Sequence, residues 1–321
     1  IPRRYEITLE PDIPTSSFSG TEIVTIEVRE AVESVTLNAI ELEIDSAYLV
    51  DADGSRLTAA VEYDEPNEQI TLSTGRLVEP GEWQVEFSFQ GKLNDQLRGF
   101  YRSTFTDEAG VEQTIATTQF EAADARRAFP CWDEPEYKAI FSVTLIVPDD
   151  LVAISNMAEV TRKPREGGKV EVRYADSPIM STYLVAFVVG PLEITDPVDV
   201  DGVPLRVVYP PGKGDLTDFA LEIGAYALRW LSNYYEIPYP GDKVDFIAIP
   251  DFAFGAMENL GAITYRENAV LIDLETTGQY EQRRVADVIA HELAHMWFGD
   301  LVTMKWWNGI WLNEAFASFM E

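Results

Sequence analysis

This sequence of 321 residues contains very little cysteine and histidine, with one cysteine and two histidines in all. A single cysteine, Cys131, excludes a disulfide within the chain and weakly favours a reducing compartment. We therefore expect a cytoplasmic protein, although a first residue of Ile1 rather than methionine is compatible with a trimmed leader. Because Cys131 lies in the apolar run F-P-C-W, we expect a buried, unreactive thiol.

Positive charge is also scarce, since 24 Lys and Arg residues face 55 Asp and Glu residues and the net charge is −31. Such a surface repels nucleic acids and anionic membranes, which excludes both as partners. There is no run of 18 apolar residues, so the sequence predicts no transmembrane segment. A salt-adapted surface and a merely acidic cytosolic surface are both open interpretations of the charge. The composition is otherwise that of a globular protein, and the length predicts two domains.

The first part of the chain has the pattern of β-strands. Apolar and polar residues alternate over 24–29, 85–89 and 141–145, with turn residues between these segments. This pattern predicts an antiparallel sandwich or saddle. Beyond residue 190 the pattern changes to a strand over 203–209, a helix over 218–235 and a strand over 244–249. We predict a β-rich domain over 1–192 and an α+β domain over 193–321.

Both histidines lie in one pentapeptide, H-E-L-A-H at 291–295. Positions i and i+4 share one helix face, so His291 and His295 can bind the same zinc ion. Glu314 follows after eighteen intervening residues and is the expected third ligand. Glu292 lies beside the metal and is the expected general base. The alternative is a chance match on an amphipathic helix, expected in roughly one chain of this length per hundred.

Two further segments become informative once a zinc site is suspected. The loop G-A-M-E-N follows a predicted strand, and its glycine lets the backbone approach a ligand, so an extended substrate could pair with it. Its residues are Gly255, Ala256, Met257, Glu258 and Asn259. Gln119 and Glu121 precede the dense segment 125–135. Taken alone, Glu258 reads as a solvated loop carboxylate and Glu121 as an ion-pair partner of a nearby arginine.

Together, in this order, these motifs resemble the zinc aminopeptidases of the gluzincin class, which includes aminopeptidase N and puromycin-sensitive aminopeptidase. The resemblance covers essentially the whole chain and implies that residues 193–321 begin a thermolysin-like catalytic domain. It implies one Zn²⁺ bound by His291, His295 and Glu314, with Glu292 as the base. It also implies that the G-A-M-E-N loop lines the cleft, and that Glu258, helped by Glu121 and Gln119, binds the free N-terminus of a peptide substrate.

The sequence departs from the family pattern in two places. Gly309 stands where aspartate is usual and Ala315 where glycine is usual, and we expect altered packing there rather than lost chemistry. The resemblance places the family's catalytic tyrosine several dozen residues beyond the last zinc ligand, past Glu321. We therefore expect this segment alone to be weakly active or inactive, because a lost oxyanion donor costs about 10²–10³ in turnover.

Three other functions remain as alternatives: a zinc endopeptidase, a bifunctional epoxide hydrolase, and a binding module without catalysis. An endopeptidase needs no ammonium anchor and would cleave amino-blocked peptides. The sequence predicts neither a preferred N-terminal residue nor an oligomeric state.

Overall fold

The computed structural model describes all 321 residues, which pack as two compact units. Each unit is discontinuous in sequence. The first unit comprises Ile1–Tyr101, Thr118–Asp149 and Glu159–Val185. The second comprises Arg102–Thr117, Asp150–Ala158 and Ala186–Glu321. The division predicted at residues 192 and 193 remains a prediction.

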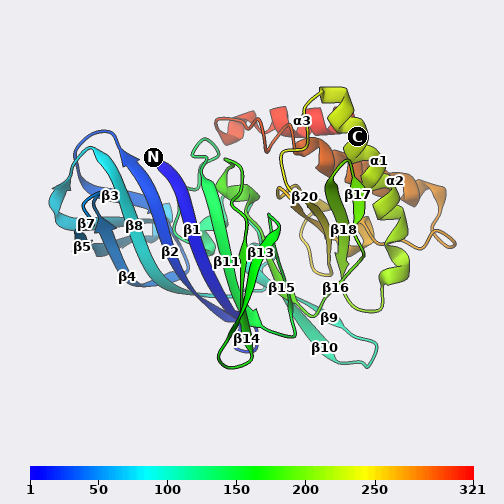
Figure 1. Ribbon diagram of the computed structural model, residues 1–321, viewed down its shortest axis with the longest axis horizontal. Coiled ribbons are helices and arrows are strands. Elements are labelled where there is room, and N and C mark those ends of the chain that lie inside the picture. The colour runs from blue at the N-terminus through cyan, green and yellow to red at the C-terminus, as the bar shows by residue number, and fades with distance from the viewer. The chain divides into compact units, whose positions relative to one another are not determined.

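The first unit is built on an eight-stranded sheet in the order β13-β14-β11-β1-β2-β8-β4-β5 (Figure 1). Its long strands alternate buried and solvent-facing residues, as the period of two in the sequence predicts. The strands are β1 (Pro2–Asp12), β2 (Ser17–Val28), β4 (Leu42–Val50), β5 (Arg56–Thr58), β8 (Gly81–Lys92), β11 (Ile140–Pro148), β13 (Glu159–Arg165) and β14 (Lys169–Tyr174).

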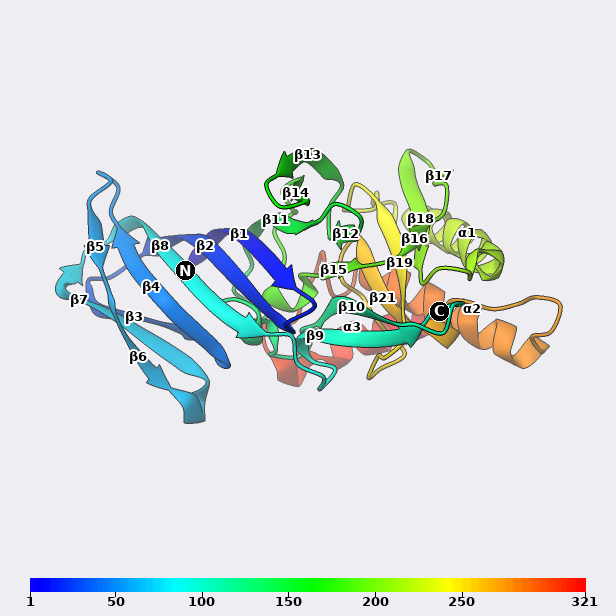
Figure 2. The same ribbon diagram turned by 90° about the horizontal axis from the view of Figure 1, so that it is seen from below.

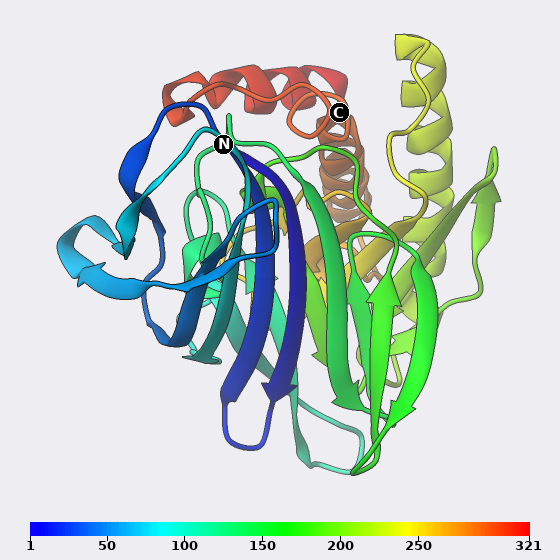
Figure 3. The ribbon, with the colours of Figure 1, turned by 60° about the vertical axis from the view of Figure 1, so that its left-hand side comes forward.

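One pair in this sheet differs from the predicted antiparallel arrangement. Strands β1 and β11 run parallel, with Tyr5 opposite Phe141 and their rings stacked at 4.9 Å. Parallel neighbours need a long crossover connection, and the chain between Asp12 and Ile140 supplies it. Figure 3 shows the neighbouring long strands β1 and β2 in blue. A smaller antiparallel sheet, β3-β7-β6, completes the unit (Figure 2). Its strands are β3 (Val32–Asn38), β6 (Ala60–Asp64) and β7 (Gln69–Val78).

The buried side of this unit contains Cys131, whose side chain is fully covered. Burial raises the pKa of the Cys131 thiol well above its ordinary value. The expectation of a buried thiol is therefore confirmed, and the raised pKa agrees with the prediction that it is unreactive.

The second unit contains a mixed sheet in the order β16-β18-β19-β21-β20, with β17 also paired to β18. The predicted segments 203–209, 218–235 and 244–249 are confirmed as β18, α1 and β19. The remaining strands are β16 (Glu193–Ile194), β17 (Val198–Val200), β20 (Ala256–Met257) and β21 (Ala262–Arg266). Most of a four-stranded sheet in the order β12-β15-β10-β9 also lies in this unit, whereas residues 99–101 of β9 and 118–119 of β10 belong to the first unit. Its strands are β9 (Gly99–Thr106), β10 (Glu112–Gln119), β12 (Val152–Ser155) and β15 (Phe187–Gly190).

Three helices accompany the mixed sheet: α1 (Asp218–Tyr235), α2 (Gln279–His295) and α3 (Trp311–Met320). Helix α1 packs closely on the sheet at Gly224, where a side chain would collide with the ring of Phe246 on β19. No helix combines the length and apolar composition of a membrane-spanning segment.

Candidate metal centre

Helix α2 places both histidines of the H-E-L-A-H segment on its inner side. Val285, Ile289 and Leu293 are buried, so the helix is held by the 3–4 spacing of its apolar residues. At its end, the Nε2 atoms of His291 and His295 lie 3.0 Å apart. The two imidazoles therefore point at a common position.

Helix α3 packs against α2 and brings Glu314 to this position (Figure 1). Its carboxylate oxygens lie 3.3 Å from Nε2 of His291 and 3.7 Å from Nε2 of His295. Three ligands at 2.0–2.1 Å in tetrahedral geometry are about 3.4 Å from one another. The separations of 3.0–3.7 Å thus fit a single zinc ion without rearrangement.

The imidazoles are oriented by partners that the spacing of the motif does not reveal. Nδ1 of His295 lies 3.0 Å from the carbonyl oxygen of Phe298, and Nδ1 of His291 lies 3.0 Å from a carboxylate oxygen of Glu321. A proton on Nδ1 leaves Nε2 free to bind metal, and such outer partners fix the ring. Phe298 stacks on Phe316 of α3 at 4.6 Å, which links the two helices at the site.

The electrostatic environment favours a cation. Burial disfavours a charged imidazole, but the carboxylates of Glu258 and Glu314 outweigh it and raise the pKa of His295 well above its ordinary value. Hydrogen bonds from His291 and His295 hold the pKa of Glu314 well below its usual range. The same carboxylates would stabilise a divalent metal ion bound to the two imidazoles.

Glu292 lies on α2 between the two histidines and is only 6 % exposed. Its neighbour across the core is Tyr265 of β21, whose phenol has its pKa raised well above normal by burial and by the charge of Glu292. The position of Glu292 beside the candidate metal ligands, on the inner side of the helix, suits a base.

The G-A-M-E-N segment forms the edge of the mixed sheet. Strand β20 is the last strand in the order, pairing only with β21, so its other side has no strand partner. Arg266 donates its backbone N–H to the carbonyl of Gly255, which makes this pair a hydrogen-bonded one in the antiparallel ladder. The next residue, Ala256, therefore directs its N–H and C=O away from β21. Gly255 is exposed, with open space where a side chain would begin.

Ala256 is half-buried, and the side chains of residues 257–259 are buried. Met257 is covered by the core, and the carboxamide of Asn259 bonds the carbonyl of Ala262 and the hydroxyl of Thr264. Glu258 is 3 % exposed, and its Oε1 lies 3.9 Å from Nδ1 of His295 and accepts no hydrogen bond. Of the predicted substrate-binding residues in this loop, Glu258 is the one that the structure brings to the histidines.

Two family models together match most of the chain. The Peptidase M1 N-terminal domain matches residues 1–184, and the Peptidase family M1 domain matches residues 219–321.

The chain belongs to the M1 peptidase family.

Curated relatives agree with this membership. The chain is 45 % identical to aminopeptidase M1 of Arabidopsis thaliana and 44 % identical to puromycin-sensitive aminopeptidase of Caenorhabditis elegans. It is 40 % identical to endoplasmic reticulum aminopeptidase 2 of Bos taurus. Each alignment covers all of this chain, but it covers only 37 %, 34 % and 34 % of the length of these three relatives, in the order named. The chain thus spans about a third of the length of the curated relatives it matches.

Family membership confirms the resemblance drawn from the motifs and the predicted fold class. A β-rich N-terminal sheet domain is followed by the beginning of the M1 catalytic domain. The assignments of individual site residues remain predictions. Gln119, at the end of β10, and Glu121 belong to the first unit, and their predicted help to Glu258 is likewise a prediction.

The two departures from the family pattern lie close to α3. Gly309 ends a short 3-10 helix, and a Cβ there would lie 3.1 Å from Cβ of Met304. A larger residue would therefore require Met304 to shift. Ala315 lies on α3 beside Glu314 and is exposed, so its methyl group does not crowd the metal ligands.

Proposed function

We propose that this M1 chain contains the zinc site and the amine anchor of an aminopeptidase that removes the N-terminal residue from peptides. The observation that supports it best is the meeting of His291, His295 and Glu314 at the mutual distances of zinc ligands. Zinc held there would polarise the scissile carbonyl and lower the pKa of a bound water to about 7.

Glu292 would act as general base and then as general acid. Its carboxylate would take the proton of the attacking water and deliver it to the nitrogen of the departing peptide. Burial on the inner side of α2 keeps this carboxylate away from bulk water, where the proton would be lost. The outer contacts of His291 and His295 would hold the two ligands in place during this transfer.

Glu258 would bind the α-ammonium group of the substrate. An α-amino group has a pKa of about 7.7–8.0 and is mostly protonated at pH 7. A buried carboxylate oxygen without a hydrogen bond is costly unless a partner arrives, and Oε1 of Glu258 is such an oxygen. Because it lies beside His295, an ammonium bound here would place the adjoining peptide bond near the metal. We propose that Glu121 and Gln119 assist this binding.

The open side of β20 would receive the peptide backbone. Ala256 directs its N–H and C=O there, so a substrate in extended conformation can pair with it as an added strand. Gly255 leaves room beside this position. The expected partners are therefore peptides with a free N-terminus, not nucleic acids. A cytoplasmic location remains a prediction, and one relative is named as an endoplasmic reticulum enzyme.

The deciding experiment uses the full-length zinc-loaded protein with one peptide in two forms, free and N-acetylated. We expect mass spectrometry to show stepwise loss of N-terminal residues from the free form alone. Glu258→Gln should reduce kcat/KM for the free form by about 10²-fold, because a buried carboxylate–ammonium pair is lost. Internal cuts in both forms would indicate an endopeptidase, and no cleavage with zinc bound would overturn the proposal.

A further inference from the structure

The approach to the edge strand β20 is an exposed segment. Residues 251 and 253–255 are solvent-exposed, and Phe254 is one of the most exposed aromatic side chains of the chain. At its start, the carboxylate of Asp251 accepts hydrogen bonds from Ser103 and from the backbone N–H of Thr104. Beyond Asp251, the segment turns and enters the strand at Ala256. An exposed approach of this kind leaves the strand poorly ordered unless other groups hold it.

The opposite end of β20 is held by buried contacts. Residues 259–262 form a tight turn, closed by a hydrogen bond from Ala262 to Asn259. Gly261 has φ +74° and lies so near the Asn156 carbonyl that no side chain would fit. The side chain of Asn156 donates to the carbonyl of Leu260, and the buried ammonium of Lys243 donates to that of Gly261 at 2.6 Å. This end is fixed by the core.

Arg266 holds the exposed end. It is the last residue of β21, and its guanidinium donates from Nε and Nη2 to the carbonyl of Phe252 at 3.1 and 3.0 Å. Nη2 also donates to the carbonyl of Ala253 at 2.9 Å. Its backbone N–H bonds the carbonyl of Gly255. One residue thus binds three carbonyls in the four residues that precede Ala256.

We propose that Arg266 is a positioning residue for the peptide-binding edge: it holds the approach to β20 so that Ala256 presents its backbone to substrate already ordered. The inference rests on the proposed function, since it assigns to Ala256 the pairing with a peptide. An edge ordered before binding spares the cost of ordering it during binding. Arg266 therefore acts on substrate affinity rather than on the chemical step.

The planar fork of arginine suits this role better than the ammonium of lysine. Arg266 reaches two successive carbonyls with two nitrogens in one plane, whereas lysine offers a single point of attachment. The expected order of affinity is therefore the native protein, then Arg266→Lys, then Arg266→Met. Because Arg266 is only partly buried and bonds backbone carbonyls, the variants should fold.

The first test compares two substrates on the full-length enzyme. A pentapeptide can extend along the edge, whereas an aminoacyl anilide offers a single amide. For Arg266→Met we expect KM for the pentapeptide to rise about tenfold with kcat within about twofold, and KM for the anilide to change about twofold or less. Arg266→Lys should recover part of the loss. Equal losses on both substrates, or a loss in kcat alone, would overturn the inference.

The second test does not depend on turnover. In hydrogen exchange followed by mass spectrometry, the segment 252–257 should exchange several-fold faster in Arg266→Met, with helix α2 unchanged. Arg229→Met is the matched control, since Arg229 makes an exposed ion pair with Asp201 on the same unit. Unchanged exchange in 252–257 would overturn the role of Arg266 even if the protein proved to be an aminopeptidase. If the native protein failed to release N-terminal residues, that result would contradict the proposed function itself.

Discussion

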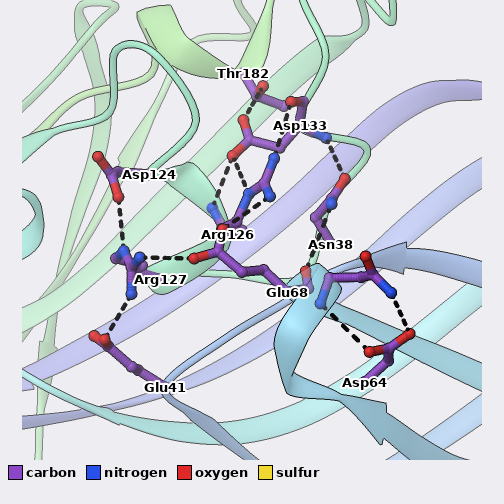
Figure 4. A network of polar contacts seen from close by, with 10 residues as sticks. Asn38, Glu41, Asp64, Glu68, Asp124, Arg126, Arg127, Asp133 and Thr182 are labelled. Atoms are coloured by element: carbon purple, nitrogen blue, oxygen red, sulfur yellow. Dashed lines mark hydrogen bonds and ion pairs between the residues drawn. The ribbon is translucent and has the colours of Figure 1, made fainter.

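Two clusters of charged side chains, one in each unit, are built on opposite plans. In the first unit, Arg126 and Arg127 lie among four carboxylates that each pair with a guanidinium, those of Glu41, Glu68, Asp124 and Asp133 (Figure 4). Arg127 pairs with three acids, Asp124, Glu41 and Glu68. The cluster has two guanidiniums for four carboxylates, but each of the four has a guanidinium partner within it. It therefore has a structural role, tying the segment around 126 to the turn before β7.

At the candidate metal centre the carboxylates are paired differently. Glu258, Glu292 and Glu314 gather around two imidazoles, and no lysine or arginine pairs with Glu258 or Glu314. One buried carboxylate oxygen, on Glu258, has no hydrogen bond. A cluster of this kind can accept positive charge from outside, such as that of the proposed metal ion and substrate ammonium. The comparison shows that an excess of carboxylates does not by itself identify a binding site, whereas a buried carboxylate that has no Lys or Arg partner and lies beside an imidazole points to one.

The largest effect should come from Glu292, the proposed base at the candidate metal centre. Glu292→Gln keeps the size of the side chain but removes its ability to accept a proton. In the full-length enzyme we expect kcat to fall by about 10²–10⁴-fold with one zinc ion still bound, as measured by turnover and metal analysis. Glu281→Gln, on the exposed first turn of the same helix, is the control and should change kcat little. A loss of less than about tenfold would exclude Glu292 as the base.

The arginine cluster should show its effect in stability instead. Arg126→Met leaves Asp133, which is 2 % exposed, without its cation. Removing one partner of a buried ion pair typically costs about 3–5 kcal/mol, so the free energy of unfolding should fall by about that amount in denaturant titrations. Arg29→Met, which removes an exposed pair at 3.8 Å, should cost less than about 1 kcal/mol. Equal effects of the two variants would contradict the structural role.

A single buried carboxylate in the first unit, that of Glu22, is a third case to compare with these two clusters. Glu22 of β2 is 1 % exposed, and neither of its carboxylate oxygens has a hydrogen-bond partner. Burial raises the pKa of Glu22 well above its ordinary value. A raised folded-state pKa contributes stability below the unfolded value near 4.5, and that contribution is lost as pH rises towards the folded pKa. Unlike Glu258 at the candidate metal centre, Glu22 has no imidazole beside it.

Glu22→Gln should therefore stabilise the protein increasingly as pH rises from 5 to 8. The difference in unfolding free energy from the native protein can grow by up to about 1.4 kcal/mol per pH unit, because one proton is involved. Thermal unfolding at several pH values measures it. Glu43→Gln, at an exposed position on β4, should show no such slope. A difference that is independent of pH would mean that Glu22 does not titrate in this range.

The contrast between local and distant contacts explains what the sequence could predict. The i, i+4 spacing of His291 and His295 is local, so the meeting of their two imidazoles was predictable, and periodicity also located α1 and β18. The contact of His295 with Phe298 depends on how the chain turns after α2, and that of His291 with Glu321 on the packing of α3. No spacing encodes either contact. The proposed role of Arg266 likewise depends on hydrogen bonds to backbone carbonyls, which a pattern of side chains does not predict.

Glu22 was accessible to sequence reasoning but was missed. It occupies an inward position in the alternation of β2, between Gly20 and Val24, where an apolar residue is the norm. A polar residue in phase with the buried face is a signal that can be read without a structure. The parallel pairing of β1 with β11 was not accessible, because it depends on a crossover of more than 100 residues between Asp12 and Ile140.

The smallest expected effect concerns the surface as a whole. With a net charge of −31, repulsion among carboxylates opposes the compact state. Salt weakens this repulsion. The Debye length falls from about 10 Å at 0.1 M to about 3 Å at 1 M, so KCl over this range should stabilise the protein by about 1 kcal/mol, or roughly 2–4 °C in Tm. The buried pair of Arg126 and Asp133 is screened little, and so KCl should raise the stability of Arg126→Met by the same amount.

If activity continues to rise in molar KCl, the surface is adapted to salt. If activity is lost there while Tm still rises, the acidic surface is not a salt adaptation. A fall in Tm would show that balanced ion pairs, rather than the excess of carboxylates, control the response to salt.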